Sequence, residues 1–99
     1  MTTGGDSKYI TLEGDLDISR QDELMRLLPD PPLPNRVVID CTKLNSVDSI
    51  ILTVLLRFRR RVIEAGDDPT KIVLVVPPGS FRQLFEIAGI PKLLTVVTT

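Results

Sequence analysis

Asp48 and Ser49 form an acid and hydroxyl pair at the head of a long apolar run, SVDSIILTVLLRFRRRV at residues 46–62. A serine at the start of a helix can act in two ways. Its hydroxyl can accept a hydrogen bond from a free backbone N–H of the first turn, which stabilises the helix by about 1 kcal/mol. It can also be phosphorylated, which adds a charge of about −1.5 to −2 where the helix dipole favours negative charge. The residues alone leave both roles open.

Other chemistry is limited by what the chain lacks. Its 99 residues include no histidine and a single cysteine, Cys41. These counts exclude Ser-His-Asp and Cys-His nucleophiles, imidazole or thiolate metal sites, and an intramolecular disulfide. A phosphoaspartate receiver needs a cluster of acids with a lysine, whereas Asp40 falls within an apolar, strand-like run. We therefore expect no enzymatic activity, no bound metal and no organic cofactor.

The elements that must position the Asp48–Ser49 pair alternate between strands and helices. Alternating polar and apolar residues predict a strand from Lys8 that breaks at Gly14. Continuous apolar runs at residues 36–42 and 71–77 are typical of parallel strands covered on both faces. The run KLLTVVTT at residues 92–99 predicts a last strand.

Three helices are predicted between these strands. The first follows residue 18, with Ser19 and Asp22 as a capping box, and ends before Pro29. The second runs from Ser49 to residue 65, where Gly66 closes it. The third has Ser80 and Gln83 as a capping box, and it ends at Gly89 because Pro91 forbids its continuation. The order β-α-β-α-β-α-β indicates one α/β domain over residues 8–99, behind a disordered tail at residues 1–7.

The second helix has an unusually wide apolar arc. Placed at about 100° per residue, its apolar side chains cover roughly 200°, whereas an ordinary surface helix shows a stripe of about 100°. Either the rest of the domain covers this arc, or part of it remains open for contact with a partner. Ile50 falls outside the arc, on the polar side with Thr53 and Arg57, which marks the first turn as a candidate contact surface.

Charge and hydropathy restrict the partners and the location. The net charge is −1, and the arginines of RFRRR spread over the polar side of the helix without interleaved aromatic residues. We therefore expect no nucleic-acid binding. No apolar run is long enough to span a bilayer, and the N-terminus lacks a signal pattern, so we expect a cytoplasmic protein without membrane insertion.

Three stretches together resemble the STAS domain of bacterial anti-sigma factor antagonists: LEGDLDIS, RVVIDCTKLNSVDSIILTVLL and KIVLVVPPGSFRQLFEIAGIPKLL. Residues 14–17 match the family's Gly-Glu-Leu-Asp turn, and residues 47–52 match its hydrophobic-Asp-Ser-Ser/Thr-Gly-Leu motif. Residues 84–90 match its late helix that ends in glycine. Ile50 and Ile51 replace the second hydroxyl and the glycine of the motif.

The resemblance implies a fold and a function. It implies a STAS-like domain with a mixed sheet of about four to five strands packed by helices. Such proteins bind an anti-sigma factor, often a serine kinase, and so release a sigma factor, and phosphorylation of the serine at position 49 turns binding off. The alternative is a solitary STAS subunit that supports a membrane transport ATPase. The residues expected to contact the partner are Asp15, Asp17, Asp48, Ser49, Ile50, Thr53 and Arg57.

Overall fold

The structure, a computed structural model, describes residues 7–15, 18–46 and 49–98. Its four strands are β1 (Ser7–Asp15), β2 (Arg36–Ser46), β3 (Ile72–Val76) and β4 (Thr95–Thr98). Its four α-helices are α1 (Gln21–Leu27), α2 (Ser49–Glu64), α3 (Ser80–Ile87) and α4 (Ile90–Leu93). Short 3-10 helices, η1 (Ile18–Arg20) and η2 (Pro69–Lys71), precede α1 and β3. The predicted α/β class is confirmed.

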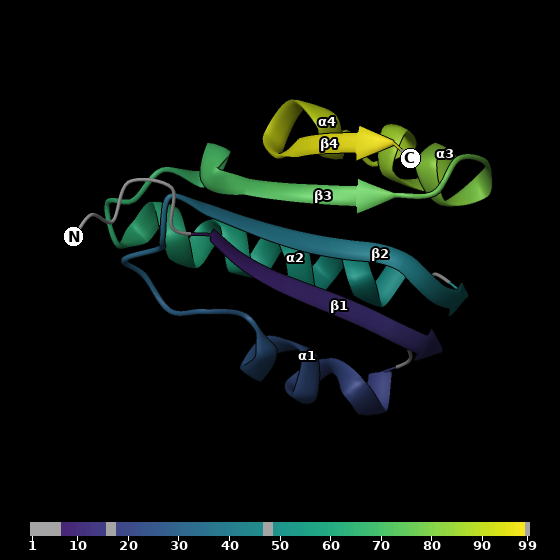
Figure 1. Cartoon of the computed structure of the whole chain (residues 1–99), viewed down its shortest axis with the longest axis horizontal. Coiled ribbons are helices and arrows are strands. Elements are labelled where there is room, and N and C mark those ends of the chain that lie inside the picture. Colours follow the sequence, from purple (N-terminus) through teal and green to yellow (C-terminus); the bar gives the residue numbers. More distant parts are fainter. Residues whose placement is uncertain (1–6, 16–17, 47–48, 99) are drawn as a thin grey trace.

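The strands form one sheet in the order β1-β2-β3-β4 (Figure 1). Each neighbouring pair runs parallel, whereas a mixed sheet was expected. The parallel arrangement follows from the connections, because α1, α2 and the α3–α4 pair each return the chain to the same end of the sheet. Residues 1–6 of the expected tail lie outside the described residues, and Ser7 already belongs to β1.

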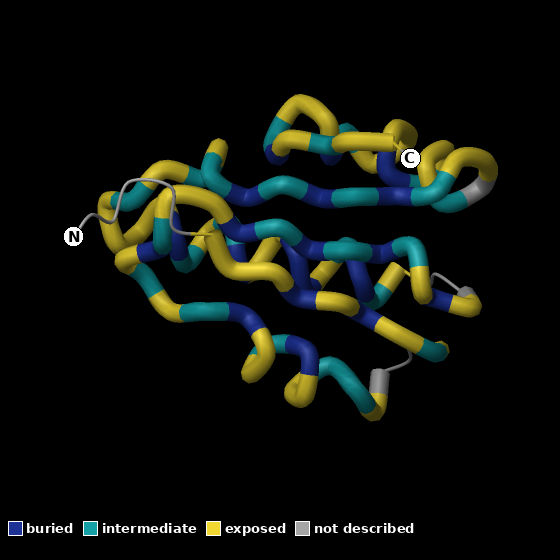
Figure 2. Tube along the Cα trace, in the orientation of Figure 1, coloured by how far each residue is buried: buried dark blue, intermediate teal, exposed yellow. Residues whose placement is uncertain are grey.

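The core lies on one face of the sheet. Burial alternates along β3, where Ile72, Leu74 and Val76 are fully buried and the valines between them are only partly so (Figure 2). The long α2 packs across this face, and α1 packs against α2. The prediction that helices cover β2 and β3 on both faces is therefore wrong, because the described helices cover only one face. A strand with one buried face normally alternates between apolar and polar residues. In β3 both faces carry apolar residues, so the sequence shows no such alternation.

The middle of the domain is a continuous apolar cluster. Phe58 of α2 and Phe85 of α3 are its largest fully buried side chains. Cys41 on β2 is also fully buried, and its burial raises the pKa of the thiol to about 12. A thiol with this pKa remains protonated at neutral pH, so Cys41 acts as a small apolar core residue.

The helix ends differ from the predicted capping pattern. Ser19 lies in η1, and the cap position of α1 is Arg20, which makes no side-chain capping hydrogen bond. Gly79, one residue before the expected Ser80, caps α3. Pro91 stands in the first turn of α4, where its missing N–H costs nothing, so the chain forms a new helix there before β4. The end of α2 matches the prediction, since Gly66 adopts a positive φ of 79° just past Glu64.

Candidate functional site

The ends of β1 and β2 bring two of the predicted motifs to one edge of the sheet. Asp15, the last residue of β1, is in register with Ser46, the last residue of β2. The helix α2 begins three residues later, at Ser49 (Figure 1). The carboxyl ends of parallel strands share one edge of a sheet, which is where loops of α/β proteins commonly carry binding residues. The register is consistent with Asp15 and Ser49 contacting one partner, as the family resemblance implies.

Ser49 is the first residue of α2 and is exposed to solvent. Among the described helices none covers it, so a kinase or a binding partner is able to reach its side chain. It stands where the free N–H groups of a helix start carry a partial positive charge, which stabilises an added phosphate by about 0.3–1 kcal/mol. Ser49 is the first residue of the helix itself, so the cap position of α2 falls on residue 48, outside the described residues. The position of Ser49 is compatible with a modified residue.

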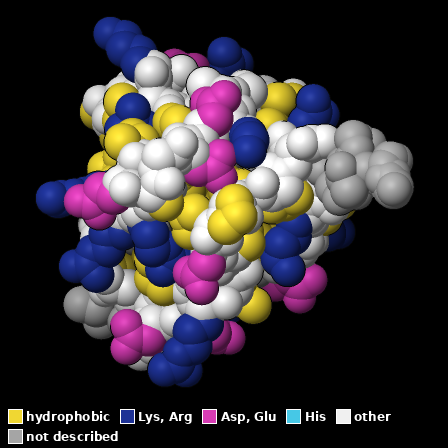
Figure 3. Space-filling view, turned by 90° about the vertical axis from the view of Figure 1, so that its left-hand side faces the viewer, with side chains coloured by type: hydrophobic (Ala, Val, Ile, Leu, Met, Phe, Trp, Pro, Cys, Tyr) yellow, Lys and Arg dark blue, Asp and Glu magenta, His cyan; other side chains and the backbone are white. Residues whose placement is uncertain are grey.

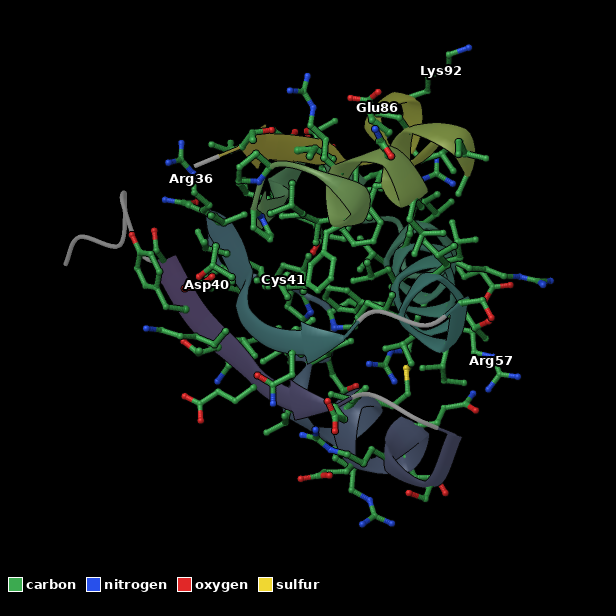
Figure 4. All side chains as sticks on the ribbon, turned by 90° about the vertical axis from the view of Figure 1, so that its right-hand side faces the viewer. Arg36, Asp40, Cys41, Arg57, Glu86 and Lys92 are labelled. Atoms are coloured by element: carbon green, nitrogen blue, oxygen red, sulfur yellow. The ribbon has the colours of Figure 1, made fainter. Side chains whose placement is uncertain are left out.

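A line of exposed side chains continues from Ser49 along α2. Thr53 and Arg57 follow at intervals of four residues and are also exposed. Residues four apart lie on the same face of a helix, so these three side chains form one strip. Arg57 points away from the sheet, on the outer side of α2 (Figure 4). The strip offers a partner one continuous contact surface, from the Ser49 hydroxyl at the start of the helix to the Arg57 guanidinium two turns away.

The two isoleucines after Ser49 have different surroundings. Ile50 is half-buried and packs against the core with part of its side chain, although the helical wheel placed it on the polar side. Ile51 is completely buried. The side chain that replaces the glycine of the motif therefore points inward, and it does not obstruct the approach of a partner to Ser49.

Arg20 holds the end of β1 in place, a role that sequence reasoning missed. Its Nη1 donates hydrogen bonds to the carbonyl oxygens of Glu13 and Asp15, each at 2.8 Å. Its Nε also pairs with the Glu23 carboxylate at 3.1 Å. Between the two carbonyls, Gly14 has a φ of 78°, and a Cβ there would approach Nη1 to 3.5 Å. The end of β1 that bears Asp15 is thus held by the residue that immediately precedes α1.

Three of the seven predicted contact residues, Asp15, Ser49 and Ile50, lie near the ends of β1 and β2 and the start of α2. Thr53 and Arg57 lie one and two turns further along α2. Asp17 and Asp48 lie outside the described residues. The wide apolar arc of α2 is mostly covered, but Leu56 and Ile63 remain 39% and 43% exposed.

Other parts of the described chain offer weaker sites. Two shallow hollows of about 220 and 380 Å³ lie around α3, α4 and β4, away from Ser49. Within residues 7–15, 18–46 and 49–98, no three acidic or cysteine side chains gather as metal ligands. No described helix is both long enough and apolar enough to cross a membrane.

Charges of both signs are mixed on the end of the molecule that Figure 3 shows. Basic and acidic side chains alternate there with apolar ones, and no extended basic area forms on that face. Several of the described arginines are already paired, including Arg60 with Glu64 and Arg82 with Glu86. With a net charge of −1 over the whole chain, these mixed charges give no strong field to attract a polyanion.

Comparison with known proteins agrees with the geometry. A family model described as "Mlab, STAS domain" matches residues 2–96. No curated protein matches the chain.

Proposed function

This chain belongs to the STAS domain family, and we propose that it is a non-enzymatic cytoplasmic antagonist of an anti-sigma factor. In this proposal it binds the anti-sigma factor, often a serine kinase in this family, through the start of α2, and so frees a sigma factor for transcription. STAS domains mediate protein–protein contacts, which agrees with the exposed strip on α2. The observation that carries the proposal is the exposed Ser49 at the first position of α2, beside the strand end that bears Asp15.

Phosphorylation of Ser49 would act as the switch. The folded domain tolerates a phosphate at this exposed helix start, because the dipole there favours negative charge. A partner that covered the same position would have to bury a group of about two negative charges, at a cost of several kcal/mol. Since about 1.4 kcal/mol changes affinity tenfold, the modification is able to weaken binding a hundredfold or more.

A second candidate function is a stable contact with a membrane transport ATPase. The observation that favours it is the pair Ile50 and Ile51, which stand where a switchable member of the family carries a hydroxyl residue and glycine. The accessible part of Ile50 suits a permanent apolar contact, and its full burial would contribute at most about 1.5–3 kcal/mol. In this case the same face binds, but phosphorylation plays no part.

Affinity purification from the native cell, read by mass spectrometry, names the partner and separates the two candidates. Titration calorimetry with that purified partner then tests the face. We expect Ser49→Asp and Ile50→Asp each to weaken binding by tenfold or more, with thermal stability changed by no more than about 1 kcal/mol for Ser49→Asp. Ser49→Ala removes the hydroxyl without adding charge and separates loss of the hydroxyl from a charge effect.

Ile63→Asp provides a matched control, because Ile63 is exposed on the same helix but more than three turns from Ser49. It should leave the affinity unchanged. If Ser49→Asp and Ile50→Asp bind as tightly as the wild type, the start of α2 is not the interface. If Ser49→Asp alone leaves the affinity unchanged, the Ser49 hydroxyl has only a structural role and the permanent contact is favoured.

A further inference from the structure

The face of the sheet opposite α2 lacks a covering layer among the described residues. Val38 on β2 and Val73 and Val75 on β3 point to this face and are only partly buried, while their neighbours along each strand are fully buried. Figure 4 shows the sheet from its edge, with α2 on one side and Asp40 directed to the other. Parallel sheets are almost always covered on both faces. An open face that carries valines is therefore expected to be covered by another molecule.

An apolar row crosses the open face. The strand register places Tyr9 beside Val38, and Val38 beside Val73. Side chains at paired positions of a sheet point to the same face, so these three residues form one line across β1, β2 and β3. Tyr9 is 74% exposed, which leaves most of its ring without a packing partner in the single chain.

Opposite charges flank this row at equal distances. Along β2, Arg36 lies two residues before Val38 and Asp40 lies two residues after it, so all three point to the open face. Arg36 and Asp40 are therefore about 13 Å apart at the usual rise of a strand. Figure 4 shows both on the side away from α2. In the part of the chain that the structure describes, neither residue belongs to an ion pair.

The carboxylate of Asp40 is fixed in position by its neighbour Thr42, and Lys43 of the same strand also acts on it electrostatically. The carboxylate accepts hydrogen bonds from the backbone N–H and the hydroxyl of Thr42, at 2.8 and 2.6 Å. These bonds lower the pKa of Asp40 below its ordinary value, so the group is ionised at neutral pH. A fixed carboxylate loses little side-chain freedom when a second charge joins it.

We propose that two copies of this chain pack open face to open face, about a twofold axis that passes over Val38 of β2. The axis lies between the sheets and perpendicular to the strands, so each β2 runs antiparallel to the β2 of the other copy. Arg36 of each chain then faces Asp40 of the other, and the row of Tyr9, Val38 and Val73 meets its own equivalent. Face-to-face sheets pack about 10 Å apart, a gap that arginine and aspartate side chains together can bridge.

A second copy suits this face better than another partner. The sequence Arg36–Val38–Asp40 is complementary to itself when reversed, which is the property that a twofold interface requires. Besides Arg36 and Asp40, the paired and exposed Glu13 and Lys43 add one charge of each sign near the ends of β1 and β2. The face therefore has no net charge to attract a polyanion or a single ion. It is also small, with four strands about 4.8 Å apart, which corresponds to a weak interface of under about 1,200 Å² in total. The start of α2 remains free, so this dimer does not depend on the proposed function.

Charge reversal gives a direct test by sedimentation velocity of the whole chain at low salt, from about 10 µM to about 1 mM protein. The wild type should dimerise with rising concentration. Arg36→Asp and Asp40→Arg alone should each weaken association at least tenfold, because each places like charges opposite one another twice. An equimolar mixture of the two variants should associate again, since every facing pair in the mixed dimer is then of opposite sign.

Two further variants make the outcome unambiguous. Tyr9→Lys changes an exposed side chain, preserves the fold and sets two cations against each other at the axis, so it should also weaken association tenfold. Arg60→Asp, an equal charge change on the outer side of α2, should have no effect. A wild type that is monomeric throughout, a dimer that tolerates both reversals and Tyr9→Lys, or a mixture of folded variants that fails to associate would each overturn the proposal.

Discussion

The carboxylate of Asp67 accepts a hydrogen bond from the backbone N–H of Leu33 at 2.6 Å, across 34 positions of the chain. Leu33 is a buried residue in the proline-rich connector between α1 and β2. The same carboxylate also binds Lys71 Nζ at 2.8 Å and the Asp68 N–H at 2.7 Å. Asp67 therefore joins the connector to the turn that follows α2.

The first prediction concerns acid stability. The Leu33 hydrogen bond, the Lys71 contact and the Asp68 N–H lower the pKa of Asp67 to about 2, from an ordinary value of 3.8. A lowered pKa in the folded state means that the stabilisation is present above pH 3.8 and is lost as the pH falls towards 2. We expect the urea midpoint of the wild type to fall in this window.

The variant Asp67→Asn should be less stable at pH 7 and should show a flatter dependence on pH below 5. Lys71→Ala serves as the comparison, because it removes the ion pair but leaves the Leu33 bond in place. The urea midpoint of Lys71→Ala should keep most of the wild-type dependence on pH below 5. If the midpoint of Asp67→Asn falls with acid as steeply as that of the wild type, another group controls the acid transition.

The second prediction concerns Arg20 and the end of β1. Its guanidinium bridges the carbonyl oxygens of Glu13 and Asp15. Hydrogen bonds that involve a charged group contribute about 1.5–3 kcal/mol, and a guanidinium presents a rigid fork that a lysine ammonium lacks. Arg20→Ala should therefore lower the free energy of unfolding by about 1–3 kcal/mol, and Arg20→Lys should recover only part of it.

Urea unfolding followed by circular dichroism measures this difference. Hydrogen exchange should also show faster opening at residues 13–15 in Arg20→Ala than in the wild type. Arg26→Ala, an exposed position on α1, is the control and should stay within about 0.5 kcal/mol of the wild type. Equal stability of the Arg20 and Arg26 variants would mean that the bridge does not hold the turn.

Local sequence signals predicted the parts of the fold that depend on neighbouring residues. The start of α2 at Ser49 and its stop at Gly66 follow from a hydroxyl residue and a glycine at the ends of an apolar periodic run. The strand β3 follows from a run of β-branched residues. The candidate site follows from a motif match, which predicted Asp15 and Ser49 as contacts of one partner without information on the pairing of β1 with β2.

Features that depend on distant contacts were not predictable in this way. The Asp67–Leu33 bond joins residues whose local sequences read only as turn and connector. Pro91 marks the end of one helix and is equally suited to begin another, so α4 was missed. Ile50 and Ile51 have the same side chain, and only the packing of α2 on the sheet shows that the second is buried completely and the first in part.

The third prediction uses this difference between the two isoleucines. Ile51 is 0% exposed and belongs to the core, so Ile51→Ala should cost about 2–5 kcal/mol in unfolding free energy. Ile51→Gly, which restores the residue of the family motif, should cost about 1 kcal/mol more because glycine weakens a helix interior. A domain of this size has only about 5–15 kcal/mol of stability, so the glycine variant should be close to unfolding.

The folded fraction of Ile51→Ala should nevertheless bind a partner as tightly as the wild type does, because the side chain does not reach the surface near Ser49. Thr53→Ala is the stability control, since Thr53 is exposed one turn away and its loss should change stability by less than about 0.5 kcal/mol. Urea unfolding gives the stabilities, and titration calorimetry gives the affinities. An Ile51→Ala variant with nearly wild-type stability would show that position 51 faces outward, as a glycine of the motif would, and that the first turn of α2 packs differently on the sheet.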